Sequence, residues 1–249
     1  MQEGRLDHHG VALAWQRIPG RSPTVVFLPG YRSDMTGDKA NALAGLCAVR
    51  GQAMLRFDYS GHGASGGQFT DGTVGVWLAD TLAVIDRLTE GALVLVGSSM
   101  GSWIGLLAAL ARTDRVVAFA GIAAAPDFTE ALMWDSMTPG EQATLMQTGV
   151  LPMASDYGEP LPITRALIED GRTRLLLTGP IRLACPVRLL HGQQDADVPW
   201  ERSLRLMQLL AGGDVQLTLV KDGDHRLSRP QDLALLRDVL LPLLGEDGG

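Results

Sequence analysis

The chain has 249 residues, of which 46% are hydrophobic and 20% are charged, and its formal net charge is −7. Because the chain is acidic and has no run of basic residues, we expect no nucleic-acid partner. No apolar run reaches the roughly 18 residues that span a bilayer, so we expect no membrane span. The polar start "MQEGRLDHHG" lacks the apolar core of a signal peptide. The expected location is therefore cytoplasmic.

Short apolar runs alternate with helical patterns in the first half of the chain. The run "TVVFLPG" is typical of a buried strand that ends in a Pro-Gly turn, and a helix is expected over residues 38–50. A second strand in "AMLRFDYSGHG" leads into a glycine-rich loop. Apolar residues at helical spacing then predict a helix over 73–88, followed by the strand "ALVLVG" and a helix over 102–111.

The same alternation continues in the second half. The strand "RVVAFAGIAAAP" is followed, after a long interval, by "PVRLLHG", a helix over 200–210, the strand "VQLTLV" and a helix over 231–244. Continuously apolar strands that are each followed by a helix predict a mostly parallel central sheet with helices on both faces. We therefore predict an α/β core formed by residues 1–126 and 184–249.

Residues 127–183 interrupt this rhythm, because they contain no clear strand until their end. Connections of this length are usually lids or binding loops, so we predict a helical cap over the strand ends. The alternative is a helical pair that simply packs on the sheet. Trp134 and Met137 are candidate substrate-binding residues, because flexible Met and Trp side chains suit an adaptable apolar pocket.

The stretch "LVLVGSSMGSW" contains the pattern G-x-S-x-G with Ser99 at its centre. This pattern forms a nucleophile elbow, in which small flanking residues let the backbone close around the serine between a strand and a helix. A strand is predicted before Ser99 and a helix after it, and the helix N-terminus favours developing negative charge. Ser98 is the weaker candidate, because it occupies the variable second position.

A serine needs a base at neutral pH, and the base needs an acid that orients it. Elbow enzymes carry serine, acid and histidine in that order along the chain. Asp195 in "LLHGQQDADVP" and His225 in "LVKDGDHRLS" both follow predicted strands in this order. Asp127, after an earlier strand, is the main rival acid, and Asp197 is a weaker one.

The other histidines compete poorly with His225 as the base. His8 and His9 lie in a polar N-terminal segment and are expected to be solvated. His62 and His191 lie at strand ends near the predicted site, where we expect them to shape their loops by hydrogen bonding.

The oxyanion of an acyl-transfer intermediate needs two N–H donors. The expected donors are the backbone N–H groups of Met100, directly after the nucleophile, and of Tyr31 in the loop "LPGYRSDMTG". The Tyr31 and Arg32 side chains are alternatives as pocket-lining groups, and Arg32 is a substrate-binding candidate.

No cofactor or metal is expected, because the chain has neither a spacing such as H-E-x-x-H nor a G-x-G-x-x-G turn. Cys47 and Cys185 are expected to be free thiols in apolar surroundings.

The stretches "FLPGYRSDMTGDKA", "RFDYSGHGASGG", "LVGSSMGSW", "CPVRLLHGQQDADVPW" and "DGDHR" resemble the α/β-hydrolase superfamily. They are most similar to its branch of mitochondrial palmitoyl-protein thioesterases that also cleave acyl glucuronides. The resemblance runs from about residue 22 to the last predicted helix and is least clear over 127–183. It implies catalytic roles for Ser99, Asp195 and His225.

These observations predict a serine hydrolase of carboxylic esters or thioesters, with a small molecule or an acylated protein as its substrate. The nearest alternatives on the same fold are an acyltransferase, a C–C hydrolase and a peptidase. A binding protein without catalytic activity is the alternative from another class, since fold alone does not fix function. The sequence leaves the oligomeric state open.

Overall fold

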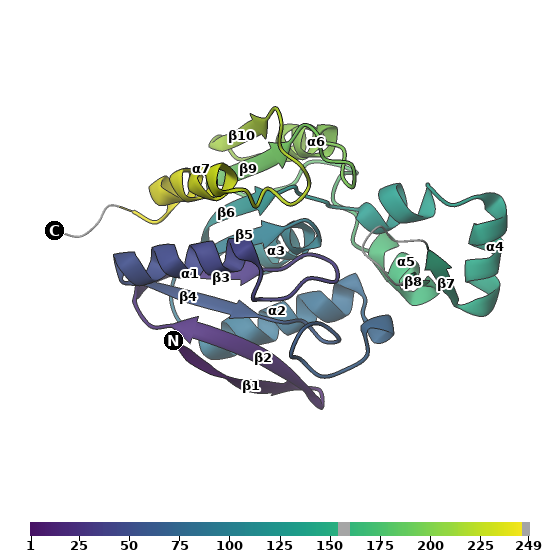
Figure 1. Ribbon diagram of the computed structural model, residues 1–249, viewed down its shortest axis with the longest axis horizontal. Helices are drawn as coiled ribbons and strands as arrows, with labels where there is room; N and C mark the ends of the chain where they lie inside the picture. Colours follow the sequence, from purple (N-terminus) through teal and green to yellow (C-terminus); the bar gives the residue numbers. More distant parts are fainter. Residues whose placement is uncertain (154–159, 246–249) are drawn as a thin grey trace.

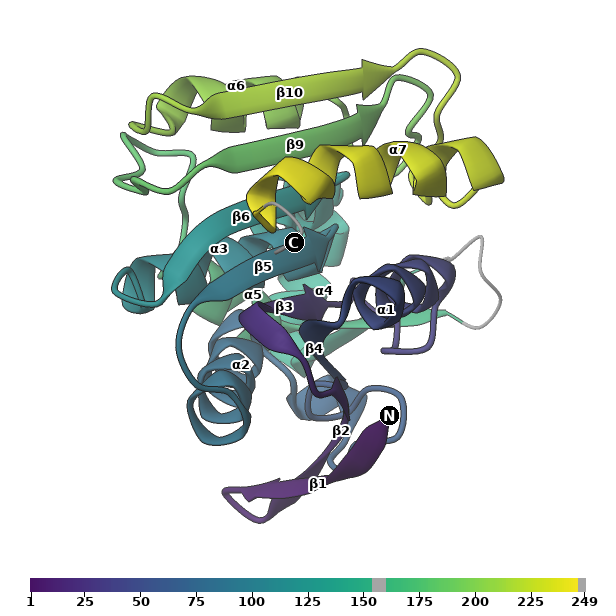
Figure 2. The same cartoon turned by 90° about the vertical axis from the view of Figure 1, so that its left-hand side faces the viewer.

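The computed structural model describes residues 1–153 and 160–245. A central sheet has the strand order β1-β2-β4-β3-β5-β6-β9-β10 (Figures 1 and 2). The pairs β1–β2 and β2–β4 are antiparallel, and all other neighbours are parallel. The strands are β1 (Gln2–His8), β2 (Val11–Ile18), β3 (Arg21–Leu28), β4 (Gln52–Phe57), β5 (Leu93–Ser98), β6 (Val116–Ile122), β9 (Val187–Gly192) and β10 (Val215–Val220).

Helices cover both faces of this sheet, as expected for parallel strands that are apolar on both sides. Side chains alternate between the faces along each strand. On β5, Leu95 packs into the cluster formed with α2 (Val74–Leu88), α3 (Met100–Ala111) and α6 (Glu201–Leu209). Its neighbours Val94 and Val96 pack on the other side with α1 (Asp38–Arg50) and α7 (Pro230–Leu240).

The predicted mostly parallel α/β architecture is confirmed. The helix expected over 38–50 and the strand "VQLTLV" have the bounds that the sequence predicted, and the elbow helix begins two residues earlier than expected, at Met100. The antiparallel pair β1–β2 at the sheet edge was not expected from the sequence. The last helix is shorter than the predicted range 231–244. It is α7, which ends at Leu240, and a 3-10 turn, η3 (Leu241–Leu243), follows it.

The interval between β6 and β9 forms a separate group of elements at one end of the molecule (Figure 1). It contains η2 (Thr129–Trp134), α4 (Pro139–Thr148), α5 (Arg165–Arg172) and a short antiparallel pair, β7 (Val150–Met153) with β8 (Leu161–Thr164). The β7–β8 pair differs from the expectation of helices alone. The division into core and cap at residues 126 and 184 stays a prediction.

Two partly buried polar contacts hold this insertion, and the first of them joins it to the core. The Gly75 N–H at the start of α2 donates to Asp170 Oδ2 at 2.7 Å. The Asp127 carboxylate accepts the N–H groups of Leu176 and Leu177, each at 2.8 Å. Both contacts join residues that are far apart in the sequence: the first fixes the insertion to α2, and the second joins the beginning of the insertion to the segment after α5.

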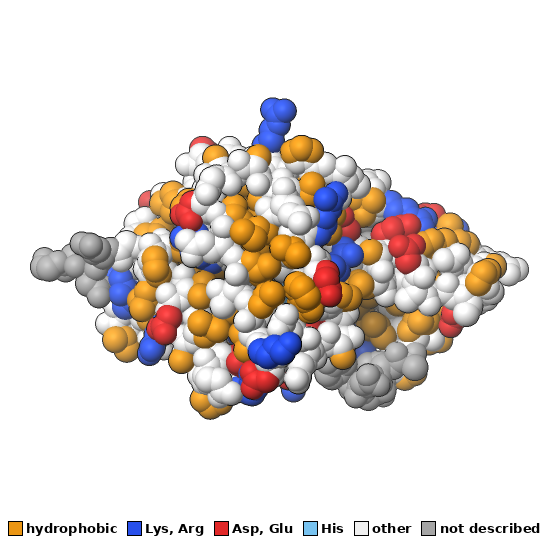
Figure 3. All heavy atoms as spheres, turned by 90° about the horizontal axis from the view of Figure 1, so that it is seen from above, with side chains coloured by type: hydrophobic (Ala, Val, Ile, Leu, Met, Phe, Trp, Pro, Cys, Tyr) orange, Lys and Arg blue, Asp and Glu red, His pale blue; other side chains and the backbone are white. Residues whose placement is uncertain are grey.

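The described part of the chain has no helix that is long and apolar enough to cross a membrane. On the face shown in Figure 3, acidic and basic side chains are interspersed among apolar ones.

The central strand should dominate stability, because its side chains are buried on both faces. Truncating the fully buried Leu95 to alanine is expected to lower the free energy of unfolding by about 2–5 kcal/mol. Val49→Ala, on the exposed side of α1, is the matched control and should change it by less than about 0.5 kcal/mol. Urea unfolding measures both; equal effects would contradict the assignment of β5 to the core.

Candidate active site

Ser99 lies between β5 and α3 with φ 53° and ψ −119°, a backbone conformation that non-glycine residues rarely adopt. Its N–H donates to the Ile122 carbonyl at 2.8 Å, and its carbonyl accepts the Ser102 N–H at 2.9 Å. The flanking glycines are required by close backbone contacts. A Cβ on Gly97 would lie 2.3 Å from the Gly101 oxygen, and a Cβ on Gly101 would lie 2.1 Å from the Leu28 oxygen. This is the strained geometry of a nucleophile elbow.

Asp195 and His225 are brought together from the loops after β9 and β10. His225 Nδ1 lies 2.7 Å from Asp195 Oδ2, and the Asp195 side chain is fully buried whereas that of His225 is 21% exposed. The parallel strands β9 and β10 end at the same edge of the sheet as β5, so these loops meet the elbow edge. An imidazole held through Nδ1 keeps Nε2 available for a proton.

A second histidine holds the same carboxylate. His191 Nε2 lies 3.0 Å from both Asp195 Oδ2 and the Val198 carbonyl, and its Nδ1 lies 2.7 Å from Ser203 Oγ. Because a carbonyl only accepts, Nε2 carries the proton and Nδ1 accepts the serine hydroxyl. The expected loop-shaping role of His191 therefore extends to the acid itself, whose Oδ1 accepts the N–H groups of Asp197 and Val198.

These contacts keep Asp195 ionised. Burial raises the pKa of its carboxyl, but the hydrogen bonds from His191 and His225 outweigh burial and hold the pKa well below its usual range. A charged acid beside His225 favours the imidazolium that forms when this residue accepts a proton.

The loop between β3 and α1 lies against the elbow. A Cβ on Gly30 would be 3.4 Å from the Ser99 Cβ, so the backbone of this loop approaches the nucleophile closely. The next residue is Tyr31, whose ring packs against Phe69, Trp77 and Phe128. Burial raises the pKa of the Tyr31 phenol, which keeps it protonated. Met100 is the first residue of α3. Met100 directly follows Ser99, and Tyr31 follows the glycine that approaches it, but their role as oxyanion donors stays a prediction.

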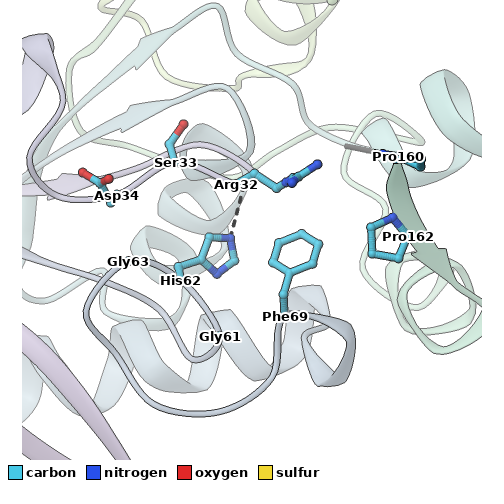
Figure 4. Close-up of a pocket in the computed structure, with 9 residues that line it drawn as sticks. All are labelled: Arg32, Ser33, Asp34, Gly61, His62, Gly63, Phe69, Pro160 and Pro162. Atoms are coloured by element: carbon cyan, nitrogen blue, oxygen red, sulfur yellow. Dashed lines mark hydrogen bonds between the residues drawn. The ribbon is translucent and has the colours of Figure 1, made fainter. Parts of the chain in front are cut away.

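A cavity of about 400 Å³ opens beside this loop (Figure 4). Arg32 extends along one side of it, and Pro160 and Pro162 of the insertion form the facing side (Figure 4). The remaining lining residues are Ser33, Asp34, Gly61, His62, Gly63 and Phe69. Arg32 therefore lines a pocket beside the loop after β3, and its role in substrate binding stays a prediction.

Trp134 and Met137 do not line this cavity. Met137 is 5% exposed and packs with Leu145 and Ile168 inside the insertion. The guanidinium of Arg172 lies 4.3 Å from the centre of the Trp134 ring. Both side chains contribute to the packing of the insertion, and their role in substrate binding stays a prediction.

Asp127, the rival candidate for the acid, has another role in the structure, and the two cysteines are free as expected. Asp127 anchors Leu176 and Leu177, and burial raises the pKa of its carboxyl. Cys47 and Cys185 are free thiols, and burial raises the pKa of each.

One group of side chains has the residue types of a metal site. Ligand atoms of Asp195, Asp197 and His225 lie within 4.8 Å of one another. Within this group, His225 Nδ1 and Asp195 Oδ2 hydrogen-bond to each other at 2.7 Å, as an acid–base pair does.

Asp58, buried after β4, was not among the residues expected from the sequence. Its Oδ1 accepts the Met35 N–H at 2.7 Å, and its Oδ2 accepts the Ala64 N–H at 2.8 Å. It therefore joins the loop after β3 to the loop after β4. An aspartate directly before a glycine-rich loop was the available signal.

The family model of the alpha/beta hydrolase family matches residues 25–236. The chain therefore belongs to the α/β-hydrolase family, the class that the sheet order and the elbow also define.

Particular relatives narrow this class. Mitochondrial palmitoyl-protein thioesterase ABHD10 of mouse is 40% identical over 226 residues, which cover 90% of this chain and 76% of the mouse protein. The human ABHD10 is 39% identical, with coverage of 90% and 74%. A putative hydrolase from Agrobacterium vitis S4 superimposes with a TM-score of 0.93 at 42% identity, over 98% of each chain. The solved structure of mouse ABHD10 gives 0.90 at 37% identity, also over 98% of each chain.

The names of the mouse and human relatives include the word mitochondrial. They contradict the expected cytoplasmic location, which is therefore wrong. The expectation rested on the polar start "MQEGRLDHHG" and on the lack of an apolar run that could span a bilayer, and neither observation addresses mitochondrial targeting.

The strain at Ser99 makes a prediction about stability. The free energy of unfolding of Ser99→Gly should exceed that of Ser99→Ala by about 1 kcal/mol, because glycine adopts a positive φ without the strain of a Cβ. Urea unfolding of the two variants measures this difference. Both variants lack the hydroxyl, so the comparison isolates the backbone. Equal or lower stability of the glycine variant would contradict a strained elbow.

Proposed function

We propose that the protein is a serine hydrolase that cleaves acyl thioesters or carboxylic esters, with Ser99 as nucleophile, His225 as base and Asp195 as the acid that orients it. The observation that carries this proposal is the 2.7 Å contact between His225 Nδ1 and Asp195 Oδ2 at the sheet edge where Ser99 forms the elbow.

The first half of the reaction acylates the enzyme. Ser99 Oγ attacks the acyl carbon while His225 Nε2 takes the hydroxyl proton, and Asp195 stabilises the imidazolium. The N–H groups of Met100 and Tyr31 hold the oxyanion of the tetrahedral intermediate, and the N-terminus of α3 adds a favourable dipole. The bond to the leaving sulfur or oxygen breaks, and His225 gives that atom its proton.

The second half releases the acid. Water attacks the acyl-Ser99 ester while His225 takes one of its protons, and the same donors hold the second oxyanion. The ester bond to Ser99 then breaks, and His225 returns the proton to Oγ. The net reaction adds one water and yields a carboxylic acid and a thiol or alcohol. Every step uses groups of this chain and water.

Support for thioesters as substrates comes from the relatives that are named palmitoyl-protein thioesterases. By this likeness an acylated protein or a small acyl thioester is the proposed substrate. We propose that part of the substrate enters the cavity beside Arg32, because this cavity borders the loop that carries Tyr31.

A matched pair of variants distinguishes Asp195 from Asp197 as the catalytic acid. Asp195→Asn is expected to lower kcat about 10⁴-fold, because it removes the charge and the correct histidine tautomer. Asp197→Asn, two residues away and exposed, should keep kcat within about threefold, since its backbone N–H to Asp195 is retained. Initial rates on an acyl thioester measure both, and a larger loss in the Asp197 variant would overturn the acid assignment.

Substrate class follows from initial rates on p-nitrophenyl esters and acyl thioesters from acetyl to palmitoyl, with Ser99→Ala as the control. Rates that rise with chain length and vanish in the control would support a long-chain thioesterase or esterase. A preference for acetyl would keep the triad but contradict the palmitoyl likeness. No turnover, together with no labelling of Ser99 by a fluorophosphonate, would favour the binding protein without catalytic activity.

A further inference from the structure

The Asp195 carboxylate has donors on both of its oxygens. Its Oδ1 accepts the N–H groups of Asp197 and Val198 at 2.9 and 2.8 Å. Its Oδ2 lies 2.7 Å from His225 Nδ1 and 3.0 Å from His191 Nε2. Two carboxylate oxygens offer about four lone-pair sites, so these donors fill the acceptor capacity of a fully buried side chain. Loss of any donor therefore leaves a buried charge less well satisfied.

His191 is the one donor of this set that is neither a backbone group nor the proposed base. It lies at the end of β9, four residues before the acid. Its Nε2–H is shared between Asp195 Oδ2 and the Val198 carbonyl, each 3.0 Å away. Because the Val198 N–H donates to the other carboxylate oxygen, Asp195 is gripped from both sides. These bonds together oppose rotation of the carboxylate about its Cβ–Cγ bond.

The opposite side of the imidazole is held by α6, which packs beside β9 (Figure 1). The Ser203 hydroxyl donates to His191 Nδ1 at 2.7 Å, and both residues are 0% exposed. A ring that is bonded through both nitrogens cannot turn without breaking a buried hydrogen bond. His191 thus ties the acid to a strand and a helix of the core.

We propose that His191 is a positioning residue for the hydrolase, which holds Asp195 Oδ2 in line with His225 Nδ1 and thereby keeps the base oriented toward Ser99. The proposal rests on the proposed function. It assigns a role in the reaction to a histidine that is buried behind the acid and that the triad itself does not include.

Loss of the His191 donor affects the acid in two ways. The carboxylate loses one of the bonds that oppose its rotation, so the direction of its bond to His225 is less well defined. Burial raises the pKa of the Asp195 carboxyl, and the hydrogen bond from His191 is the first of the effects that lower it. An acid that turns, or that gains a proton, no longer orients the imidazole and no longer stabilises the imidazolium.

The first test compares His191→Leu with His191→Gln on an acyl thioester. Leucine offers no donor, and we expect kcat to fall about 10- to 100-fold, the loss seen when the hydrogen-bond partner behind a metal ligand is removed. KM should stay within about threefold, because the residue lies behind the acid. Urea unfolding confirms that each variant is folded.

His191→Gln is the matched control, since both variants remove the ring. The glutamine amide nitrogen reaches about as far as Nε2 of a histidine and carries two N–H donors, one each for Asp195 and Val198. We expect kcat of His191→Gln to stay at least about fivefold above that of His191→Leu. Equal losses in the two variants would overturn the proposal, since ring packing would then explain the effect.

The second test is a double-mutant cycle with Asp195→Asn. A residue that acts only through the acid has little left to do once the charge of the acid is gone. We therefore expect His191→Leu to lower the residual kcat of Asp195→Asn by less than about threefold. A loss as large as in the wild-type background would overturn the proposal, because the effect would not pass through Asp195.

The third test needs no altered function. In ¹⁵N NMR spectra of the wild type with labelled histidines, His191 should carry a proton on Nε2, and His191→Gln assigns the signal by its loss. A proton on Nδ1 alone would overturn the proposal, because Nε2 could then not donate to Asp195. This measurement decides even where His191→Leu does not fold.

The outcomes also separate the positioning role from the proposed function. If the wild type shows turnover that depends on Ser99 but folded His191→Leu keeps its kcat, the positioning role is overturned and the proposed function stands. Absence of any turnover that depends on Ser99 in the wild type would overturn both.

Discussion

The backbone conformation of Ser99 is the constraint on which the rest of the site depends. A residue with a side chain holds a positive φ only where its surroundings fix it. Here β5 is paired on both sides, the Ser99 N–H is bonded to Ile122 in the neighbouring strand, and Gly97 and Gly101 allow contacts that no Cβ could make. The same contacts place Ser99 at the N-terminus of α3. The packing of the sheet therefore holds the strained backbone, and the Ser99 hydroxyl lies beside the favourable helix dipole.

Asp195 and His225 reach this point through the parallel order of the strands. Because β5, β9 and β10 end at one edge, the loops that carry Asp195 and His225 return to the elbow. Two histidines and two backbone N–H groups converge on the Asp195 carboxylate, which fixes it before any substrate arrives. This preorganisation is what a charge-stabilising site requires, since the donors need not reorient during the reaction.

The sequence was informative wherever one local pattern determined the structure. Apolar runs predicted the parallel sheet, and G-x-S-x-G with its flanking strand and helix predicted the elbow at Ser99. Side-chain partners that depend on distant loops were not predictable: His191 on the acid, Asp58 between two loops and His62 on the Arg32 peptide follow from tertiary geometry. Trp134 and Met137 show the same limit, because an apolar helical pattern does not tell a pocket from the packing of the insertion.

The central claim is that the reaction passes through an acyl group on Ser99. Mass spectrometry of the intact protein, quenched with acid during turnover of an acyl thioester, tests it directly when followed by peptide mapping. One added acyl group is expected on the peptide that contains Ser99, formed and lost at rates compatible with kcat. An adduct on another residue, or turnover by Ser99→Ala at the wild-type rate, would contradict it.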